Sequence, residues 1–89
     1  MKEDKIIYIA AALKRVRKQM GITQESVAGK GRINRGYLSD LEGDKNNPTI
    51  DMMFQVAYGL GIEPYELVRQ IQEDNADYPS KIDNMEPKE

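Results

Sequence analysis

Apolar residues recur at steps of three and four along the first part of the chain, a spacing that places them on one face of an amphipathic helix. Gly21 follows the last of these residues and is a typical helix end. The pattern therefore predicts a first helix that ends at Met20. Its apolar face is formed by Ile6, Ile9 with Ala10, Leu13, Val16 and Met20.

Two short helices are expected next, each opened by a residue that suits the N-cap position. Thr23 begins a helix over roughly residues 23–30, and Asn34 begins a third helix near residues 34–42. Glycines crowd the end of the second helix, so it must be short. The inward-facing residues of the pair are Val27, Ala28, Leu38 and Leu41.

A loop rich in glycine, asparagine and proline ends the third helix and leads into two more. Thr49 opens a fourth helix that Gly61 ends, and Pro64 opens a fifth, because proline suits the first helical turn. The fourth helix is expected to pack Ile50, Met53, Phe54, Ala57 and Leu60, and the fifth supplies Tyr65, Leu67, Val68 and Ile71.

The helical pattern fades beyond Asn75. Residues 1–75 are therefore predicted to form one all-α domain of five helices, in which the helix over residues 64–75 is available for dimerisation. Residues 76–89 are expected to be either a flexible tail or a segment that docks a partner.

The composition argues against most catalytic and metal chemistry. The 89 residues include no cysteine and no histidine, which rules out disulfides, thiol catalysis and thiolate zinc sites and removes the usual general base. The sequence also lacks the spacing of a phosphate-binding glycine loop. We therefore expect no enzymatic activity, no catalytic residue, no metal site and no cofactor.

The longest apolar run, residues 6–13, is far shorter than the roughly 20 residues that a membrane-spanning helix requires. The residues on either side of it also lack the layout of a signal peptide with a cleavage site. From these two features we expect a cytoplasmic chain with no membrane partner.

Charge is distributed unevenly along the chain, although the net charge is only −2. Residues 14–47 carry eight Lys or Arg and four Asp or Glu, a net of +4, whereas residues 48–73 and 74–89 each carry −3. Binding depends on the local field at the contacting face, so the basic segment fits a DNA partner. The overall acidity predicts modest affinity and strong sensitivity to salt.

The basic segment contains two short helices joined by a connection of about three or four residues. Ala28 is small enough to let the two helices approach closely, and Ile33 in the connection packs beneath them. These proportions are typical of a helix-turn-helix.

The sequence resembles the Cro/C1-type helix-turn-helix repressors, also called the XRE family, over about residues 9–68. The matching residues are Gly21-Ile22-Thr23-Gln24, Val27-Ala28, Ile33-Asn34-Arg35, Tyr37-Leu38-Ser39, Leu41-Glu42, Asn47-Pro48-Thr49, Leu60-Gly61-Ile62 and Glu66-Leu67. Within the family the chain is most similar to small phage repressors and restriction–modification controller proteins. The resemblance implies a five-helix, lambda-repressor-like fold and a function in transcription regulation.

The resemblance further implies that the third helix enters the major groove of double-stranded DNA. Its outward residues, the candidates for base contacts, are Asn34, Arg35, Gly36, Ser39 and Asp40. Arg35 is the strongest candidate because a guanidinium fits the O6/N7 edge of guanine, with a phosphate-binding or plain surface arginine as the alternative. Asp40 is either an acceptor from cytosine N4 or repulsive toward phosphate, and the favoured readings are a negative filter or a salt-bridge partner of a neighbour.

Phosphate contacts are implied for the start of the second helix and for the loop after the third. The candidates are Gln24, Tyr37, Lys45, Asn46 and Asn47. Gln24 would act together with backbone N–H groups of its helix end. The alternatives are an exposed glutamine, a tyrosine that packs between helices and an ordinary turn.

Three features concern the geometry of the motif. In relatives, the positions of Arg17 and Glu42 form an ion pair that orients the recognition helix. Arg32 stands where the family usually has Gly or Asn, so this residue must either accept a positive φ or shift the turn by one position. The glycine expected after the recognition helix is displaced, which leaves Asp44 at a position where left-handed backbone is required.

A single copy of the motif offers few phosphate contacts, so a homodimer on a palindromic operator is expected, with half-sites about 34 Å apart. The expected dimer surface is formed by Tyr65, Val68 and Ile71. The alternative function is a protein-interaction module, such as an antitoxin, that retains the helix-turn-helix fold and binds a protein through the acidic C-terminal region.

Overall fold

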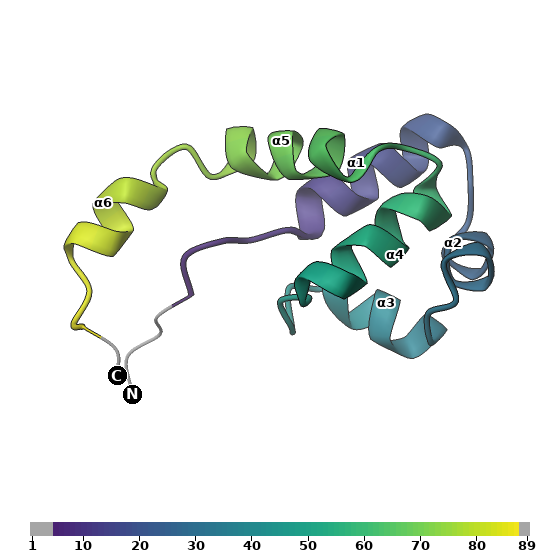
Figure 1. Cartoon of the computed structure of the whole chain (residues 1–89), viewed down its shortest axis with the longest axis horizontal. Helices are drawn as coiled ribbons and strands as arrows, with labels where there is room; N and C mark the ends of the chain where they lie inside the picture. Colours follow the sequence, from purple (N-terminus) through teal and green to yellow (C-terminus); the bar gives the residue numbers. More distant parts are fainter. Residues whose placement is uncertain (1–4, 88–89) are drawn as a thin grey trace.

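The computed structural model describes residues 5–87, and within that range the regular structure is entirely helical. Over this range the chain forms six helices. In Figure 1 most of them pack into one body, and one short helix lies at one end of its long axis. The helices are α1 (Ala10–Met20), α2 (Gln24–Gly31), α3 (Arg35–Glu42), α4 (Ile50–Leu60), α5 (Pro64–Asp74) and α6 (Tyr78–Asp83). The predicted all-α class, with a helix-turn-helix at the second and third helices, is confirmed.

The helix ends lie where the sequence signals place them. Thr23, Asn34 and Thr49 occupy the N-caps of α2, α3 and α4, and each side chain accepts the backbone N–H three residues later at 3.1 Å. Gly21 and Gly61 end α1 and α4 with left-handed backbone, at φ values of 69° and 81°. Local chemistry alone therefore sets most of the helix boundaries.

The start of α1 differs from the prediction. The apolar pattern begins at Ile6, whereas the helix begins at Ala10, and residues 5–9 form an N-terminal segment without regular secondary structure. The Tyr8 backbone pairs with the Asn75 side chain, which accepts its N–H and donates to its carbonyl oxygen, both at 3.0 Å. The Ile9 N–H donates to Asp44 at 2.9 Å. These tertiary bonds replace the intrahelical ones that a longer α1 would have made.

The core is one apolar cluster to which α1 to α5 all contribute. The inward positions predicted on α2 and α3 are confirmed, since Val27, Ala28, Leu38 and Leu41 are all buried. Ile33, in the connection between these helices, is 8% exposed and fills the space beneath them. The face of α3 that carries the two leucines is therefore fixed against the domain, which leaves its opposite face toward solvent.

The prediction for α4 is wrong at two positions. Ile50 and Phe54 are 72% and 58% exposed, whereas Val56 is almost fully buried. The buried stripe of this helix consists of Met53, Val56, Ala57 and Leu60, at steps of three and four residues. Ile50 lies in the first turn and Phe54 lies one position beside the stripe, so both point away from the core.

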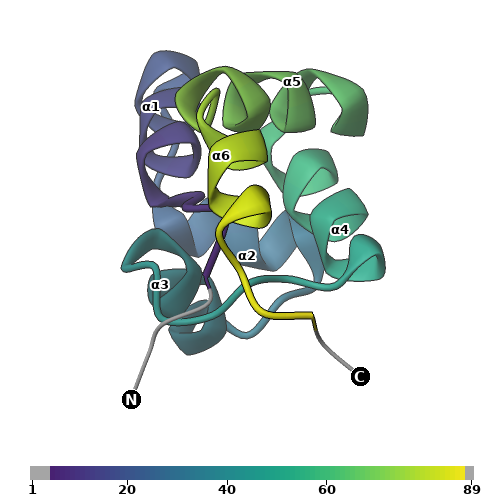
Figure 2. The ribbon, with the colours of Figure 1, turned by 90° about the vertical axis from the view of Figure 1, so that its left-hand side faces the viewer.

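Helix α6 lies in the segment that the sequence pattern left without a helix. The Lys81 ammonium of α6 lies 4.9 Å from the centre of the Tyr8 ring and donates to the Ile6 carbonyl oxygen at 3.3 Å. Figure 2 shows α6 in front of the body formed by the other helices. Over residues 5–87, no helix combines the length and the apolar character that crossing a membrane requires.

Helix α2 packs against α4 at very short range. A Cβ added to Gly59 would overlap the Val27 carbonyl oxygen, and one added to Gly31 would lie 2.5 Å from the Gln55 carbonyl oxygen. Gly29 lies in the same region of α2, yet a Cβ there meets nothing within 4 Å. Glycine at positions 31 and 59 is therefore a steric requirement of this helix pair.

We expect Gly59→Ala to lower the free energy of unfolding by about 1–3 kcal/mol, because α2 must move away from α4. Gly29→Ala is the matched control and should raise that free energy by about 0.5–1 kcal/mol, since alanine favours a helix and has open space here. Urea unfolding followed by circular dichroism measures both. Equal effects of the two substitutions would contradict the close packing of α2 on α4.

Candidate nucleic-acid interface

The helix-turn-helix presents one face of α3 at the edge of the domain. Both views place α3 at the lower edge of the body, with α2 beside it (Figures 1 and 2). Asn34, Arg35, Gly36 and Ser39 are exposed on this helix, whereas Tyr37 and Asp40 are half-buried. The five residues predicted to contact bases therefore lie on or beside the solvent face of α3.

Two of these side chains already have partners within the chain. The Asn34 Oδ1 accepts the Tyr37 N–H at 3.1 Å, which fixes the Asn34 side chain over the first turn of α3. The Asp40 carboxylate lies 4.0 Å from the Lys45 ammonium. Arg35, Gly36 and Ser39 are the members of the set that the structure leaves most open to a ligand.

A buried carboxylate joins the three N-terminal helices. Glu42, the last residue of α3, is only 5% exposed and accepts from Arg17 Nε at 2.8 Å and from Arg17 Nη2 at 3.0 Å. Gln24 Nε2, at the start of α2, donates to the same carboxylate at 3.1 Å. The ion pair implied by the resemblance is present, and α1, α2 and α3 meet at it.

The ion pair also favours the charged form of the arginine. The hydrogen bond that Arg17 donates to Glu42 is the main cause that raises the pKa of Arg17, and burial of the guanidinium opposes it. Arg17 Nη1 additionally donates to the Ile22 carbonyl oxygen at 3.2 Å, in the connection that leads to α2. The Arg17 guanidinium therefore binds both the end of α3 and the entry to α2.

The turn between α2 and α3 accommodates a non-glycine residue. Arg32 ends α2 with left-handed backbone at φ 59°, so it accepts the positive φ and the turn is not shifted. The Gln55 side chain of α4 donates to the carbonyl oxygens of Gly31 and Arg32 at 3.1 and 3.3 Å. These bonds hold the strained turn in place from the neighbouring helix.

The turn after α3 shows the same substitution of glycine by a polar residue. Gly43 has φ −106°, whereas Asp44 takes the left-handed conformation at φ 58°. Lys45, Asn46 and Asn47 follow at once and are all exposed. The structure therefore places these three predicted phosphate contacts on one loop that leaves the C-terminal end of α3.

Two partly buried polar contacts with the N-terminal segment were not predicted. Asp44 Oδ1 accepts the N–H groups of Ile9 and Ala10 at 2.9 and 3.1 Å, and the 4%-exposed Asn75 binds the Tyr8 backbone. The partners lie more than 30 residues away along the chain, so no local pattern indicates them. Only the polarity of an aspartate and an asparagine at helix ends hinted at a capping role.

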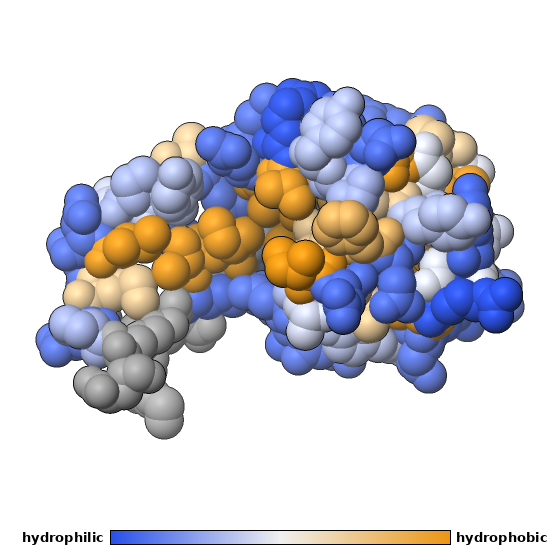
Figure 3. Space-filling model, in the orientation of Figure 1, coloured by the Kyte–Doolittle hydropathy of each residue, from blue (hydrophilic) through white to orange (hydrophobic). Residues whose placement is uncertain are grey.

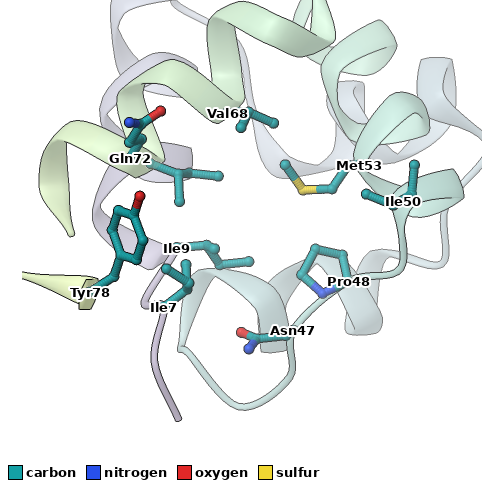
Figure 4. A pocket seen from close by; sticks show the side chains of 10 residues that line it. Ile7, Ile9, Asn47, Pro48, Ile50, Met53, Val68, Gln72 and Tyr78 are labelled. Atoms are coloured by element: carbon teal, nitrogen blue, oxygen red, sulfur yellow. The ribbon is translucent and has the colours of Figure 1, made fainter. Parts of the chain in front are cut away.

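A second surface feature is an apolar groove between the N-terminal segment, the loop that precedes α4, and helices α4 and α5. Figure 3 shows an apolar band that runs from the region of α6 toward α4. The groove has a volume of about 450 Å³, and Figure 4 shows side chains of the N-terminal segment, α4 and α5 around it. Its apolar lining consists of Ile7, Ile9, Pro48, Ile50, Met53, Val68 and Ile71.

The residues predicted for a dimer surface fall into two groups. Tyr65 and Val68 on α5 are 72% and 46% exposed, whereas Ile71 is 6% exposed and belongs to the core. Ile71 is therefore a wall of the groove and not an exposed contact. Ile50 of α4, beside Met53 at one end of the groove in Figure 4, is a further exposed apolar residue that the sequence pattern assigned to the core.

Comparison with known proteins identifies similar chains. The model of a family described as a helix-turn-helix domain matches residues 10–73. The immunity repressor protein of Bacillus phage phi105 is 36% identical over 76 residues, which cover 82% of this chain and 53% of the repressor. An uncharacterised helix-turn-helix transcriptional regulator of Sinorhizobium fredii is 39% identical over 54 residues, covering 61% of this chain and 70% of the relative. The chain thus spans about half the length of the phage repressor.

Solved structures of similar fold include two bacterial regulators. The restriction–modification controller protein C.AhdI from Aeromonas hydrophila superposes with a TM-score of 0.64 at 27% identity, covering 70% of this chain and 94% of its own. The clp gene regulator ClgR from Corynebacterium glutamicum gives a TM-score of 0.71 at 25% identity, covering 85% of this chain and 81% of its own.

We expect Arg17→Met to lower the free energy of unfolding by about 3–5 kcal/mol, because it leaves the buried Glu42 carboxylate without its cation. Arg17→Met combined with Glu42→Leu should recover much of this loss, since the unpaired charge is then removed. Urea unfolding of the four proteins of this double-mutant cycle gives the coupling energy.

The exposed pairs of Arg69 with Glu66 and Glu73 provide the matched control. Arg69→Met removes two surface ion pairs on α5, and we expect little change in stability because solvent already screens them. If Arg69→Met lowers the free energy of unfolding as much as Arg17→Met does, burial is not what makes the Arg17–Glu42 pair important for stability.

Proposed function

Because the chain belongs to the helix-turn-helix domain family, we propose that it binds specific sequences of double-stranded DNA through α3 and regulates transcription. The observation that carries the proposal is the two-sided environment of α3. Leu38 and Leu41 fix one face in the core, the Arg17–Glu42 pair fixes its end, and Arg35 and Ser39 lie on the free face. A helix held in this way is pre-organised to enter the major groove.

Arg35 is the principal base-reading residue of the proposal. It is the first residue of α3, and the N-terminal residues of a recognition helix are those that reach base edges. The guanidinium donates two parallel hydrogen bonds to guanine. Gly36 and Ser39 let the helix approach the groove floor, while Asn34 and Asp40 contribute at its two sides.

The phosphate backbone is contacted on both sides of α3. Gln24 donates one Nε2–H to Glu42, and the second hydrogen of the same amide group is available for a phosphate oxygen at the N-terminus of α2. Lys45, Asn46 and Asn47 supply a cation and two amides from the opposite end, and the half-buried Tyr37 lies between. These contacts set the orientation of the protein on the duplex without reading its sequence.

The chain acts as a homodimer in this proposal, through the exposed residues Tyr65 and Val68 of α5. Ile50 of α4 and the groove between it and Val68 extend the same apolar surface. Burial of such a surface against its copy brings two recognition helices to one side of the DNA, about one helical turn apart. Residues 1–75 then form the DNA-binding and dimerising unit, and Tyr78 of the segment 76–89 adds to the lining of the groove.

Selection of random double-stranded DNA by the purified protein tests this function directly. We expect enrichment of a palindrome with half-sites about one helical turn apart, and binding to it that weakens steeply as salt rises. Failure to enrich any sequence would favour the protein-interaction module or antitoxin. A pull-down with the full chain, compared with a chain that ends at residue 75, then identifies a partner of the C-terminal region.

We expect Arg35→Ala to relax specificity at one base pair of the selected operator, whereas Lys45→Ala weakens binding to all sequences alike. A lost guanine contact is worth about 1–3 kcal/mol of discrimination, while a lost phosphate contact lowers the salt slope by about 1. Fluorescence anisotropy on the operator and on its single-base variants separates the two. If Arg35→Ala lowers the binding affinity equally for every sequence, Arg35 does not read a base.

Val68→Lys should shift the protein from dimer to monomer, because a charge at the centre of an apolar interface is left without a partner. Met20→Lys is the control, since Met20 has a matching exposed fraction of 47% but lies on α1. Sedimentation velocity at several concentrations gives the oligomeric state. A dimer that survives Val68→Lys would place the interface elsewhere.

A further inference from the structure

Asp44 makes three hydrogen bonds that join the N-terminal segment to the loop after α3. Its Oδ1 accepts the N–H groups of Ile9 and Ala10 at 2.9 and 3.1 Å. Its backbone carbonyl oxygen accepts from the Lys5 ammonium at 2.6 Å. One residue in the loop is thereby tied to a segment that lies 34 to 39 positions earlier in the chain.

The side chain supplies the N-cap that α1 does not have in its own sequence. Ile9 occupies the N-cap position with an apolar side chain, and the first turn of α1 contains no acidic residue. The Asp44 carboxylate satisfies two free N–H groups there and places a negative charge at the positive end of the helix. The Asp44 side chain is therefore fixed at the N-terminus of α1.

The backbone of the same residue ends α3. The Asp44 N–H donates to the Leu41 carbonyl oxygen at 3.2 Å, and the Lys45 N–H donates to the Asp40 carbonyl oxygen at 2.9 Å. This is the pattern of a helix end that needs a left-handed residue, which Asp44 provides at φ 58°. The direction in which residues 45–47 leave α3 is set at this residue.

We propose that Asp44 is a positioning residue for DNA binding, which holds residues 45–47 in place by anchoring the start of their loop to the N-terminus of α1. The inference rests on the proposed function, in which these three residues contact phosphates. Lys45, Asn46 and Asn47 are exposed and follow the anchor directly, while the Thr49 cap of α4 holds the other end of the loop. Ordering the loop before binding lowers the entropy cost of the contacts.

Two substitutions at this position separate the anchor from charge and backbone effects. Asp44→Asn and Asp44→Gly both remove the negative charge, and both residues tolerate a positive φ. Only asparagine keeps an Oδ1 that accepts the N–H groups of Ile9 and Ala10. Asn46→Gly adds the backbone freedom of glycine to the same loop but keeps the Asp44 carboxylate, so a difference between the two Asp44 variants that exceeds its effect reports the anchor.

The first measurement uses the full chain without DNA. Nitrogen-15 relaxation of the backbone amides of residues 45–47 should show lower order in Asp44→Gly than in wild type, with Asp44→Asn close to wild type. Leu67→Val, a mild truncation of a fully buried α5 residue, is the control for lost stability and should leave the loop ordered. Equal loop order in both Asp44 variants would overturn the proposal.

The second measurement is binding of each protein to the selected operator as salt is varied. Asp44→Gly should bind about three- to tenfold more weakly than Asp44→Asn, since the loop must now be ordered on binding. Its salt slope should be smaller by about 0.9 for each phosphate contact that is lost. Equal slopes and affinities for the two variants would overturn the role of the anchor in DNA binding. Salt-independent or absent binding by the wild type would overturn the proposed function instead, and the relaxation result distinguishes the two failures.

Discussion

The arrangement of the helix-turn-helix depends on one buried carboxylate. Glu42 ends α3 and accepts hydrogen bonds from two side chains on other helices, Arg17 on α1 and Gln24 on α2. Transfer of a carboxylate out of water costs several kcal/mol, and it is tolerated only when a cation and further donors surround it. Because the contacts are directional, the three helices can satisfy the carboxylate in one arrangement. The apolar core stabilises the domain, whereas this contact specifies the angle at which α3 is presented.

The two turns that flank α3 are likewise fixed by polar contacts with other parts of the fold, although these contacts involve no buried ion pair. Arg32 and Asp44 both have positive φ, at 59° and 58°, where glycine would be free of strain. Each is held by hydrogen bonds from a distant element: Gln55 binds the carbonyl oxygens at the first turn, and the N-terminus of α1 binds Asp44 at the second. Replacement of glycine by these residues reduces the freedom of the unfolded chain and ties both ends of the recognition helix to the rest of the fold.

The fold was largely predictable because its signals are local. Caps at Thr23, Asn34 and Thr49 and left-handed glycines at helix ends depend on neighbouring residues only, and the family model and relatives confirm the helix-turn-helix family that the motifs indicate. The errors concern tertiary partners. Ile6 continues the apolar period of α1, yet the backbone after it is bound by Asn75 and Asp44, whose positions in space no periodicity reveals.

Surface exposure was the harder property to predict at the candidate site. Ile50 and Phe54 are apolar residues on an apolar helix, yet both are exposed. Their exposure depends on how α4 is rotated against α2, and the two helices approach closely at Gly59. The residues proposed to read bases raise the same difficulty, since the sequence identifies the outward face of α3 but not which of its side chains already have partners within the chain. Asn34 and Asp40 are such residues, the first engaged in a cap and the second beside Lys45.

The acidity of the chain links the two proposed surfaces, because the affinity of the DNA-binding face for DNA depends on pairing through the apolar surface. The net charge is −2, and the proposed phosphate contacts of one protomer include few cations. Long-range attraction to DNA is therefore weak, and in the proposed homodimer the affinity comes from short-range contacts made at two half-sites together. Joining two protomers would convert the second contact into an intramolecular event at high effective concentration. The proposed pairing therefore raises the affinity for the operator, and it makes operator occupancy depend on the concentration of the protein.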